Sequence, residues 1–422
     1  MAIPYTLLAT LFAFIIFAFI ARRLVKLPAN VWLLFLAQPL GMCSSAIIVF
    51  AGGIVATKIA AKPELATLPL TVMILGTASA VIPASMLMKK VGRRKGTMIG
   101  LGVAILGAIL CMFASLNAEF GLLVSGSFLL GSSMAFVAQM RFAAIESLPD
   151  IKDSPKAISV LMIGGIFAAI LGPEAAIVAK DWIDSPHGFA GSFLILAVFL
   201  VVALTLISLL KPIGFSQESQ SHAGRPLLQI IRQPVFIISA CAGGIAYSVM
   251  SYIMTATPLS MHEVDGHSLQ HTKWVVQSHI IAMYLPSLFS ASLIRYLGLA
   301  KLMIIGSLLY LAVVIIGISG NDYLHYWWVM VLLGIGWNFL FTSGTLLLPE
   351  AYSASERFKT QAVNDFSIFF AQAMASLSAG FVLFGYGWTI LLNIAIPAVL
   401  IMFAVSIWYL TGQRKNLRST EN

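Results

Sequence analysis

Two titratable side chains, Glu174 and His279, stand inside apolar stretches of this sequence, where they could carry protons. Among the 16 Asp and Glu residues, only Glu174 lies more than a helical turn inside such a stretch, directly after Pro173. A titratable group in an apolar stretch is costly without a partner or a water-filled cavity, so it indicates a functional site. We expect Glu174 and His279 to form a protonatable latch near one membrane surface. The alternative is that each only bonds a neighbouring helix or reaches the polar interface.

Arg141 and Asp365 form a second candidate pair, near the opposite surface. Arg141 lies about one helical turn inside the stretch 120–144, and Asp365 opens a later one. An ion pair between them would close a cavity at that surface. A guanidinium also suits carboxylate groups, so Arg141 is a candidate for binding an anionic solute. The simplest alternative pairs Arg141 with Glu146 or Asp150 in the same segment.

Other kinds of reactive site have no basis in the sequence. The three cysteines lie apart in apolar stretches, without CxxC or Cys/His spacing. The segment 261–273, MHEVDGHSLQHTK, has no HExxH pattern and is predicted to be a solvated turn, so we expect neither a metal site nor a cofactor. There is no Walker A sequence, nucleophile elbow or pair of catalytic carboxylates, which predicts that the protein is not an enzyme.

The elements that must position these residues are long apolar runs. Of the 422 residues, 59% are hydrophobic and 10% are charged, which indicates a membrane protein with the lipid bilayer as its surroundings. The net charge of +9 is spread between the runs, so no nucleic-acid partner is expected. Each run is long enough to cross a bilayer core of about 30 Å. Thirteen runs are predicted: 3–21, 31–56, 67–88, 97–116, 120–144, 157–179, 190–210, 233–258, 273–294, 302–320, 325–347, 363–384 and 388–410.

The positive charges indicate how these runs are oriented. If the runs alternate and the loop MKKVGRRK, residues 88–95, is cytoplasmic, then all but four of the 25 Lys and Arg residues fall inside. The exceptions are Lys58, Lys62, Lys180 and Lys273. A wrong number of helices would scramble this partition. We therefore expect an N-terminus outside and a cytoplasmic C-terminus.

The first run and one polar stretch divide the chain. Positive charges follow the run 3–21 and none precedes it, which is the reverse of a signal peptide, so we expect it to remain as an extra helix. The polar stretch 211–232 separates six of the other runs from the remaining six. The predicted parts are an N-terminal helix with a basic linker, 1–30, a six-helix bundle, 31–210, a cytoplasmic linker, 211–232, a second six-helix bundle, 233–411, and a cytoplasmic tail, 412–422.

An internal repeat supports this division. A shift of 206 residues aligns KKVGRRKGTMIG with RYLGLAKLMIIG, and both segments follow the second helix of their half. The positions that match are Lys89 with Arg295, Gly92 with Gly298, Lys95 with Lys301 and Gly100 with Gly306. Two related halves of six helices are therefore predicted.

The basic loop resembles the loop between the second and third helices of the major facilitator superfamily. Gly92, Arg93 and Arg94 match the Gly-Arg-Arg/Lys end of the family pattern, whereas Lys89 or Lys90 stands where the family has an acid. In the family, this acid contacts a helix terminus and so latches the loop. With a lysine in its place, whether this chain forms the latch is left open. The resemblance, over residues 31–410, implies an all-α membrane protein of two pseudo-symmetric six-helix bundles, here with one extra N-terminal transmembrane helix. It also implies that the loop lies where the two halves slide past each other, so that it could gate the transport pathway. The alternative is that its positive charges only fix the orientation of the neighbouring helices in the membrane.

A second motif, GGIFAAILGPEAA at 164–176, is similar to the fifth-helix motif of the family's antiporter branch. Gly172 and Pro173 match, while alanines replace the trailing glycines. The family implies a secondary transporter that works by alternating access, with protons as the driving ion and a monomer expected. A non-transporting membrane sensor or assembly subunit is the alternative class, and a membrane enzyme is a third.

The same resemblance places the first, fourth, seventh and tenth of the twelve helices around a central cavity. Together with Arg141, the candidates for binding a substrate there are Gln38, Gln139, Tyr252, Trp337 and Asn338. Gln38 and Asn338 are favoured because both lie well inside their runs. Amide and hydroxyl groups also join membrane helices, which is the alternative for most of these residues.

The segments TATPLSMH, 255–262, and GWNFLFTSGTLLLPEAYSASERFKTQAVNDF, 336–366, resemble a bacterial inner-membrane subgroup that includes siderophore and riboflavin carriers. This resemblance implies a small polar organic solute. Because Arg141 could meet a negative charge, uptake of a legiobactin-type carboxylate siderophore, and so of iron, is the first expectation. A riboflavin-like solute, or a drug or metabolite, is the alternative.

Overall fold

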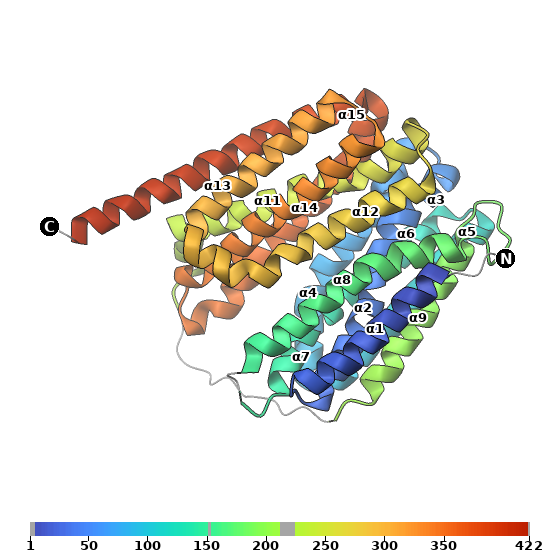
Figure 1. Cartoon of the computed structure of the whole chain (residues 1–422), viewed down its shortest axis with the longest axis horizontal. Coiled ribbons are helices and arrows are strands. Elements are labelled where there is room, and N and C mark those ends of the chain that lie inside the picture. The colour runs from blue at the N-terminus through green and yellow to red at the C-terminus, as the bar shows by residue number, and fades with distance from the viewer. Residues whose placement is uncertain (1–4, 151–152, 212–223, 421–422) are drawn as a thin grey trace. The chain divides into compact units, whose positions relative to one another are not determined.

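The computed structural model describes residues 5–150, 153–211 and 224–420, and within these ranges the chain forms helices and no strand (Figure 1). The predicted all-α class is confirmed. Parts of four predicted segments lie outside the described residues: 1–4 of the N-terminal segment, 151–152 of the first six-helix bundle, 212–223 of the linker and 421–422 of the tail.

The first nine helices form one compact unit together with residues 268–277. A π-helical turn, Ile48–Gly52, joins α2 to α3, and Gln139 joins α6 to α7, so that each of these pairs makes one long span. The helices of this unit are α1 Tyr5–Leu24, α2 Ala29–Ile47, α3 Gly53–Ile59, α4 Leu68–Val91, α5 Arg93–Asn117, α6 Phe120–Ala138, α7 Met140–Glu146, α8 Ser154–Ala179 and α9 Ala190–Ser208.

The other helices, including the part of α12 beyond residue 277, form a second compact unit. They are α10 Leu227–Ile231, α11 Pro234–Leu259, α12 Leu269–Tyr284, α13 Ser290–Ser319, α14 Tyr323–Leu347 and α15 Arg357–Thr420. The helix α12 thus begins among residues of the first unit and continues among residues of the second. The domain boundaries predicted from the sequence stay a prediction.

Eleven helical stretches of the described residues are long and apolar enough to cross a membrane. The predicted runs 363–384 and 388–410 both lie in α15, where a kink at Gly387 separates them. The run 273–294 is broken differently: α12 ends at Tyr284, and a 3₁₀ turn with Pro286 leads into α13. Proline lacks a backbone N–H and clashes with the carbonyl four residues earlier, which explains the break. The architecture is that of two six-helix bundles with one extra helix.

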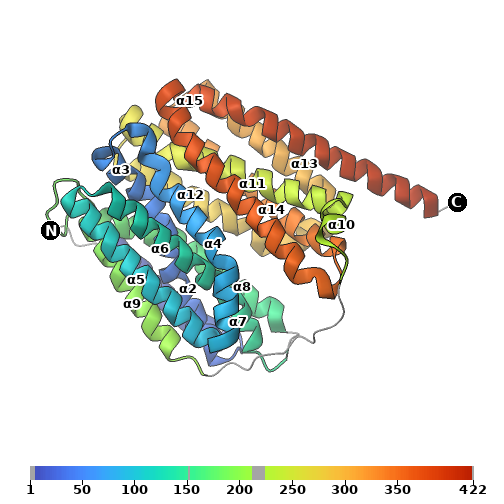
Figure 2. The ribbon, with the colours of Figure 1, turned by 180° about the vertical axis from the view of Figure 1, so that it is seen from behind.

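Corresponding helices pack alike in the two units. In the first, α5 packs against α6 and α9, and in the second, α13 packs against α14 and α15 (Figure 2). In the order of the predicted repeat, α5 and α13 are each the third helix of their half. The packing therefore agrees with the repeat.

Gly92 and Gly298, which the repeat pairs, share one unusual backbone conformation. Gly92 separates α4 from α5 with φ 85° and ψ 159°, and Gly298 interrupts α13 with φ 73° and ψ 163°. This region of φ/ψ space is open essentially only to glycine. The conserved turn geometry supports an internal duplication, and it shows why a glycine stands in the middle of the basic loop.

Replacing Gly92 by alanine should destabilise the protein by about 1–3 kcal/mol, because a side chain is strained at this φ and ψ. Among the described residues, nothing beyond its chain neighbours lies within 4 Å of the new Cβ, so the backbone alone would cause the loss. Gly102→Ala is the matched control, since Gly102 is an exposed helical residue of α5 with equally open surroundings. Thermal unfolding in detergent compares the two variants. Equal melting temperatures would refute the strain at Gly92.

The extra helix α1 docks on α8 through aromatic rings. Phe14 lies against Phe35 of α2 and Phe167 of α8, with ring centroids 5.2 and 4.6 Å apart, and Phe17 contacts the same two rings. Figure 1 shows α1 beside α8. Most of α1 is otherwise exposed, as expected for a helix that faces lipid. This docking brings the N-terminal turn of α1 to Glu174.

Candidate functional site: a buried ion pair at Glu174

Glu174 lies in a buried polar cluster of the first unit. Its carboxylate accepts a 2.6 Å hydrogen bond from Lys273 Nζ, and the other carboxylate oxygen accepts one from the Thr6 hydroxyl. The side chains of Glu174 and Lys273 are 7% and 4% exposed, so this is a buried ion pair. The pair is the one described salt bridge in which both side chains are less than a tenth exposed.

Three helices position this cluster. Glu174 follows Pro173 in α8, and the neighbouring Gly172 packs so closely on α2 that a Cβ there would lie 2.5 Å from the Ala46 Cβ. The start of α12, which carries Lys273, is held to α8 by a 3.1 Å hydrogen bond from Gln277 Nε2 to the Ile170 carbonyl. The docked α1 supplies Thr6.

The chemistry of this arrangement is that of a charge pair that a proton can break. A lone carboxylate or ammonium is strongly disfavoured in an apolar interior, whereas a hydrogen-bonded pair is tolerated. The ion pair therefore holds the start of α12 to α8.

Glu174 and His279 each have described partners of their own, and the latch between them stays a prediction. His279 is fully buried in the second unit, where its Nδ1 lies 2.7 Å from the Met330 carbonyl oxygen and its Nε2 has no described partner. Lys273 was not among the predicted site residues. Its sequence signal is a cation at the edge of the run 273–294, six residues before His279. Thr6 had no signal at all.

Arg93 of the basic loop anchors the end of the fourth span. Its guanidinium donates to both Glu146 carboxylate oxygens, at 3.0 Å from Nε and 2.7 Å from Nη2, and to Gln139 Oε1 at 2.9 Å. Bidentate pairing of this kind is both strong and directional. Glu146 is therefore a partner of Arg93. Gln139, which was predicted to bind substrate, accepts one of these hydrogen bonds from Arg93. The next residue, Arg94, is half-buried.

The other predicted charged residues have local contacts. Arg141 is exposed, and its guanidinium lies 4.8 Å from the centre of the Phe142 ring. Asp365 accepts a 3.1 Å hydrogen bond from the neighbouring Asn364 side chain. The Arg141–Asp365 pair stays a prediction.

The predicted uncharged residues fall into two groups. Asn338 is buried and donates to the Met283 carbonyl at 2.8 Å and to the Ser287 hydroxyl at 2.6 Å, so it holds α14 to the broken end of α12. In contrast, Gln38 Oε1, the Tyr252 hydroxyl and Trp337 Nε1 are buried without a hydrogen-bond partner among the described residues. Buried polar atoms of this kind are rare and call for an explanation, such as a bound solute or water.

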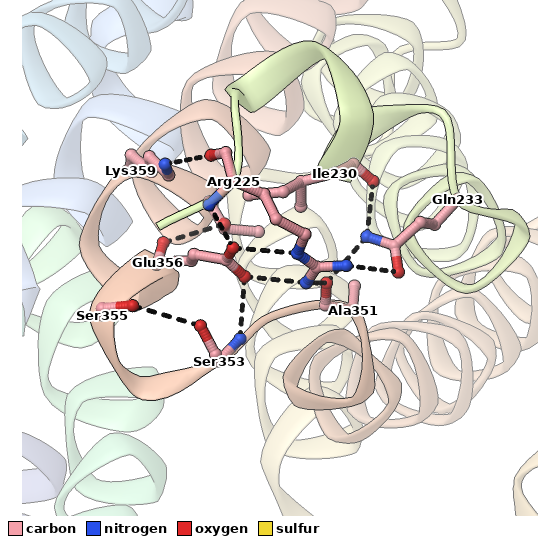
Figure 3. A network of polar contacts seen from close by, with 9 residues as sticks. Arg225, Ile230, Gln233, Ala351, Ser353, Ser355, Glu356 and Lys359 are labelled. Atoms are coloured by element: carbon pink, nitrogen blue, oxygen red, sulfur yellow. Dashed lines mark hydrogen bonds and ion pairs between the residues drawn. The ribbon is translucent and has the colours of Figure 1, made fainter. Parts of the chain in front are cut away.

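A polar network fixes the described end of the linker to the second unit (Figure 3). Arg225 donates to the two Glu356 oxygens from Nε at 2.8 Å and from Nη2 at 2.7 Å, and its backbone N–H donates at 2.6 Å. Lys359 donates to the Arg225 carbonyl, and the Ser353 N–H donates to Glu356 at 3.0 Å. The network joins the linker to the connection between α14 and α15.

The Glu356 carboxyl makes this network sensitive to pH. Its hydrogen bonds from Arg225, and then from the Ser353 N–H, hold its pKa well below its ordinary value of 4.5. The unfolded chain therefore takes up this proton at a higher pH, so the contribution of Glu356 to stability is complete above about pH 4.5 and declines as the pH falls toward the folded-state pKa.

Glu356→Gln should accordingly lower the melting temperature at pH 7, and the difference from the wild type should narrow as the pH falls below 4.5. Asp153→Asn, which removes an exposed pair with Lys156, is the control and should change little. Melting curves from pH 7 to pH 3 measure both variants. A difference that stays constant over this range is incompatible with the network.

Two histidines of the segment 261–273 bond backbone groups. His262 Nδ1 lies 2.9 Å from the His267 carbonyl oxygen, and His267 Nε2 lies 2.9 Å from the Asn321 carbonyl oxygen. Asp265 accepts from the Tyr326 hydroxyl at 2.6 Å. These contacts order the turn. No group of three or more His, Cys, Asp or Glu residues able to hold a metal is found in the described part of the chain.

The chain is similar to known membrane transporters along most of its length. A family model described as Major Facilitator Superfamily matches residues 33–270. The riboflavin transporter RfnT of Brucella anthropi is 36% identical over 373 residues, which cover 88% of this chain and 93% of that protein. The uncharacterised transporter YdeG of Bacillus subtilis is 29% identical over 389 residues, covering 88% and 90%.

Solved structures show the same fold at low sequence identity. The nucleoside transporter NupG aligns with a TM-score of 0.68 at 13% identity, over 90% of this chain and 99% of that one. FucP in its outward conformation aligns with a TM-score of 0.60 at 15% identity, over 89% and 97%. At these identities the likeness concerns the fold alone.

Proposed function

Because the chain belongs to the Major Facilitator Superfamily, we propose that it is a proton-coupled secondary transporter that carries a riboflavin-like solute across a bacterial inner membrane by alternating access. One observation carries the choice of substrate. The 36% identity to a riboflavin transporter extends over 88% of the chain and so includes both six-helix bundles. In a carrier that works by alternating access, the solute binds between the two bundles, so both bundles supply its contacts. A similarity that covers both bundles therefore supports a similar solute more strongly than one confined to a single bundle.

The Glu174–Lys273 pair is the proposed site of proton coupling. A proton that reaches Glu174 converts the carboxylate to a neutral acid and releases the Lys273 ammonium from its 2.6 Å contact. Loss of the pair weakens the attachment of the start of α12 to α8, which then depends on the hydrogen bond from Gln277 to the Ile170 carbonyl. Deprotonation restores the pair.

Uptake into proteoliposomes tests the proposal. Purified protein in vesicles with an alkaline interior should accumulate riboflavin above its external concentration, and a protonophore should abolish the accumulation. Vesicles without protein are the control. Accumulation that persists with the protonophore present would remove proton coupling, and an absence of riboflavin movement under every gradient would remove the substrate assignment.

A carboxylate siderophore is the second candidate, and one observation favours it. The Arg141 side chain is exposed and could meet a carboxylate, the group that guanidinium binds best. A ferric carboxylate chelate, added in excess in the same assay, should compete with riboflavin only if the site accepts anions. Movement of the chelate with no movement of riboflavin would select the siderophore. If neither solute moves, a sensor or assembly subunit becomes the better description.

The predicted orientation and a monomeric state complete the proposal. A fluorescent protein fused after residue 422 folds only in the cytoplasm, so bright cells are expected if the C-terminus is cytoplasmic. Dark cells with full-length fusion protein in the membrane would reverse the orientation.

A further inference from the structure

Four aromatic side chains of the second unit form a compact cluster. Trp337 and Phe341, one helical turn apart on α14, are stacked on each other, with nearly parallel ring planes at 16° and centroids 5.1 Å apart. Tyr247 of α11 meets both rings edge-on, at 83° and 87° and at 5.2 and 5.1 Å. Phe369 of α15 meets Tyr247 at 70° and 6.0 Å. We call these four residues the aromatic corner, because flat faces meet there almost at right angles.

The aromatic corner is incompletely buried. Trp337 is 5% exposed, whereas Tyr247, Phe341 and Phe369 are all only half-buried. Trp337 Nε1 is itself buried, and it is a donor without a partner among the described residues. An ordinary packing cluster would leave neither open ring surface nor a buried N–H unsatisfied. Both features are those of a site built for an aromatic ligand with hydrogen-bond acceptors.

The charge of the surrounding helices narrows the class of ligand. Neither α11, Pro234–Leu259, nor α14, Tyr323–Leu347, contains an Asp, Glu, Lys or Arg residue. The helix α15, which supplies Phe369, carries Asp365 one turn earlier, and an acid there disfavours an anionic ligand. Charged ligands are recognised by charged or strongly polar groups, whereas a neutral flat ring binds by stacking and edge contacts. The aromatic corner therefore suits an uncharged polycyclic ring better than a carboxylate chelate.

We propose that the aromatic corner is the binding surface for the fused-ring part of the transported solute, and that Trp337 Nε1 donates a hydrogen bond to a ring acceptor. This inference rests on the proposed function and deepens it. The isoalloxazine of riboflavin is flat, uncharged at neutral pH and rich in carbonyl and imine acceptors. Its sugar-alcohol tail makes no use of the aromatic corner, so the ring alone should bind and the tail alone should not.

Flavin fluorescence tests the proposal directly, because stacking on Trp quenches it. Titration of detergent-purified protein with riboflavin should show quenching, lumiflavin should compete, and ribitol should not. Loss of one stacking partner weakens ring binding by about 5- to 150-fold. Trp337→Ala and Phe341→Leu should therefore each weaken binding at least tenfold, equivalent to ~1.4 kcal/mol. Phe341→Leu conserves side-chain volume and removes only the flat ring, so it guards against a loss caused by misfolding.

Two controls and one independent assay separate the possible failures. Trp337→Phe keeps an aromatic ring but loses the indole N–H, so it should bind more weakly than the wild type and more tightly than Trp337→Ala, whereas Trp408→Ala, which changes an exposed residue of α15, should bind like the wild type. Wild-type affinity in both Trp337→Ala and Phe341→Leu would overturn the proposal that the aromatic corner binds the ring. If those variants also take up riboflavin normally in vesicles, the proposed transport of riboflavin stands, and the ring binds elsewhere in the protein. A wild type that neither binds nor moves riboflavin overturns both.

Discussion

Replacing Lys273 by methionine is expected to lower the free energy of unfolding by about 3–5 kcal/mol, because the variant leaves the Glu174 carboxylate buried without its cation. Both side chains of the pair are less than a tenth exposed, so water cannot take the place of the ammonium. Methionine is close to lysine in length and apolar, and packing around the site is retained. Reversible unfolding in detergent with increasing denaturant measures the loss.

Two further variants make this result specific. Lys180→Met removes the exposed pair with Asp181 and should cost no more than about 1 kcal/mol. The double variant Lys273→Met/Glu174→Gln carries no buried charge at the site, and it should recover most of the stability lost in Lys273→Met. If the single and double variants were equally unstable, lost packing and not an unpaired charge would be the cause.

Glu174→Gln is expected to abolish riboflavin accumulation driven by a pH gradient while leaving exchange of riboflavin across the membrane intact. Glutamine keeps the shape of the side chain and its bond from Thr6, but it cannot take up a proton. The carrier would then equilibrate its solute without linking it to protons. Uptake in vesicles with and without an imposed gradient measures this separation.

The matched control for this prediction is Glu119→Gln, an acid that precedes α6 outside the apolar spans and should leave accumulation unchanged. Thr6→Val is informative as well, since it removes the second hydrogen bond and keeps the titrating group. Undiminished accumulation in Glu174→Gln would show that the proton is carried elsewhere, and His279, buried and with a free Nε2 among the described contacts, would be the next group to replace.

The helices and the loop glycines were predictable because each depends on local physics. An apolar run long enough to cross a bilayer has few alternatives to a helix, as α5 and α9 show. Gly92 and Gly298 were paired by a sequence shift and adopt the same conformation, since a positive φ combined with ψ near 160° is open essentially only to glycine. Burial of Glu174 in a helix was equally local, because the acid lies among apolar neighbours.

Side-chain partners were harder to predict because they depend on how distant segments pack. Glu174 pairs with Lys273, 99 residues away, and Glu356 pairs with Arg225, 131 residues away. No periodicity encodes such pairs. The end of α12 at Tyr284 was missed for another reason: a run defined by hydropathy takes no account of the missing N–H of Pro286. Asn338 illustrates the consequence, since its hydrogen bonds to this broken helix end could not be predicted, and its role in binding a substrate stays a prediction.

Counterflow in proteoliposomes tests most directly whether the protein is a carrier for a flavin. Vesicles loaded with unlabelled riboflavin and diluted into a trace of labelled riboflavin should take up the label transiently above its equilibrium level, with no ion gradient present. Only a site that faces the two sides in turn produces this overshoot. Label that enters no faster than in vesicles without protein would contradict the account.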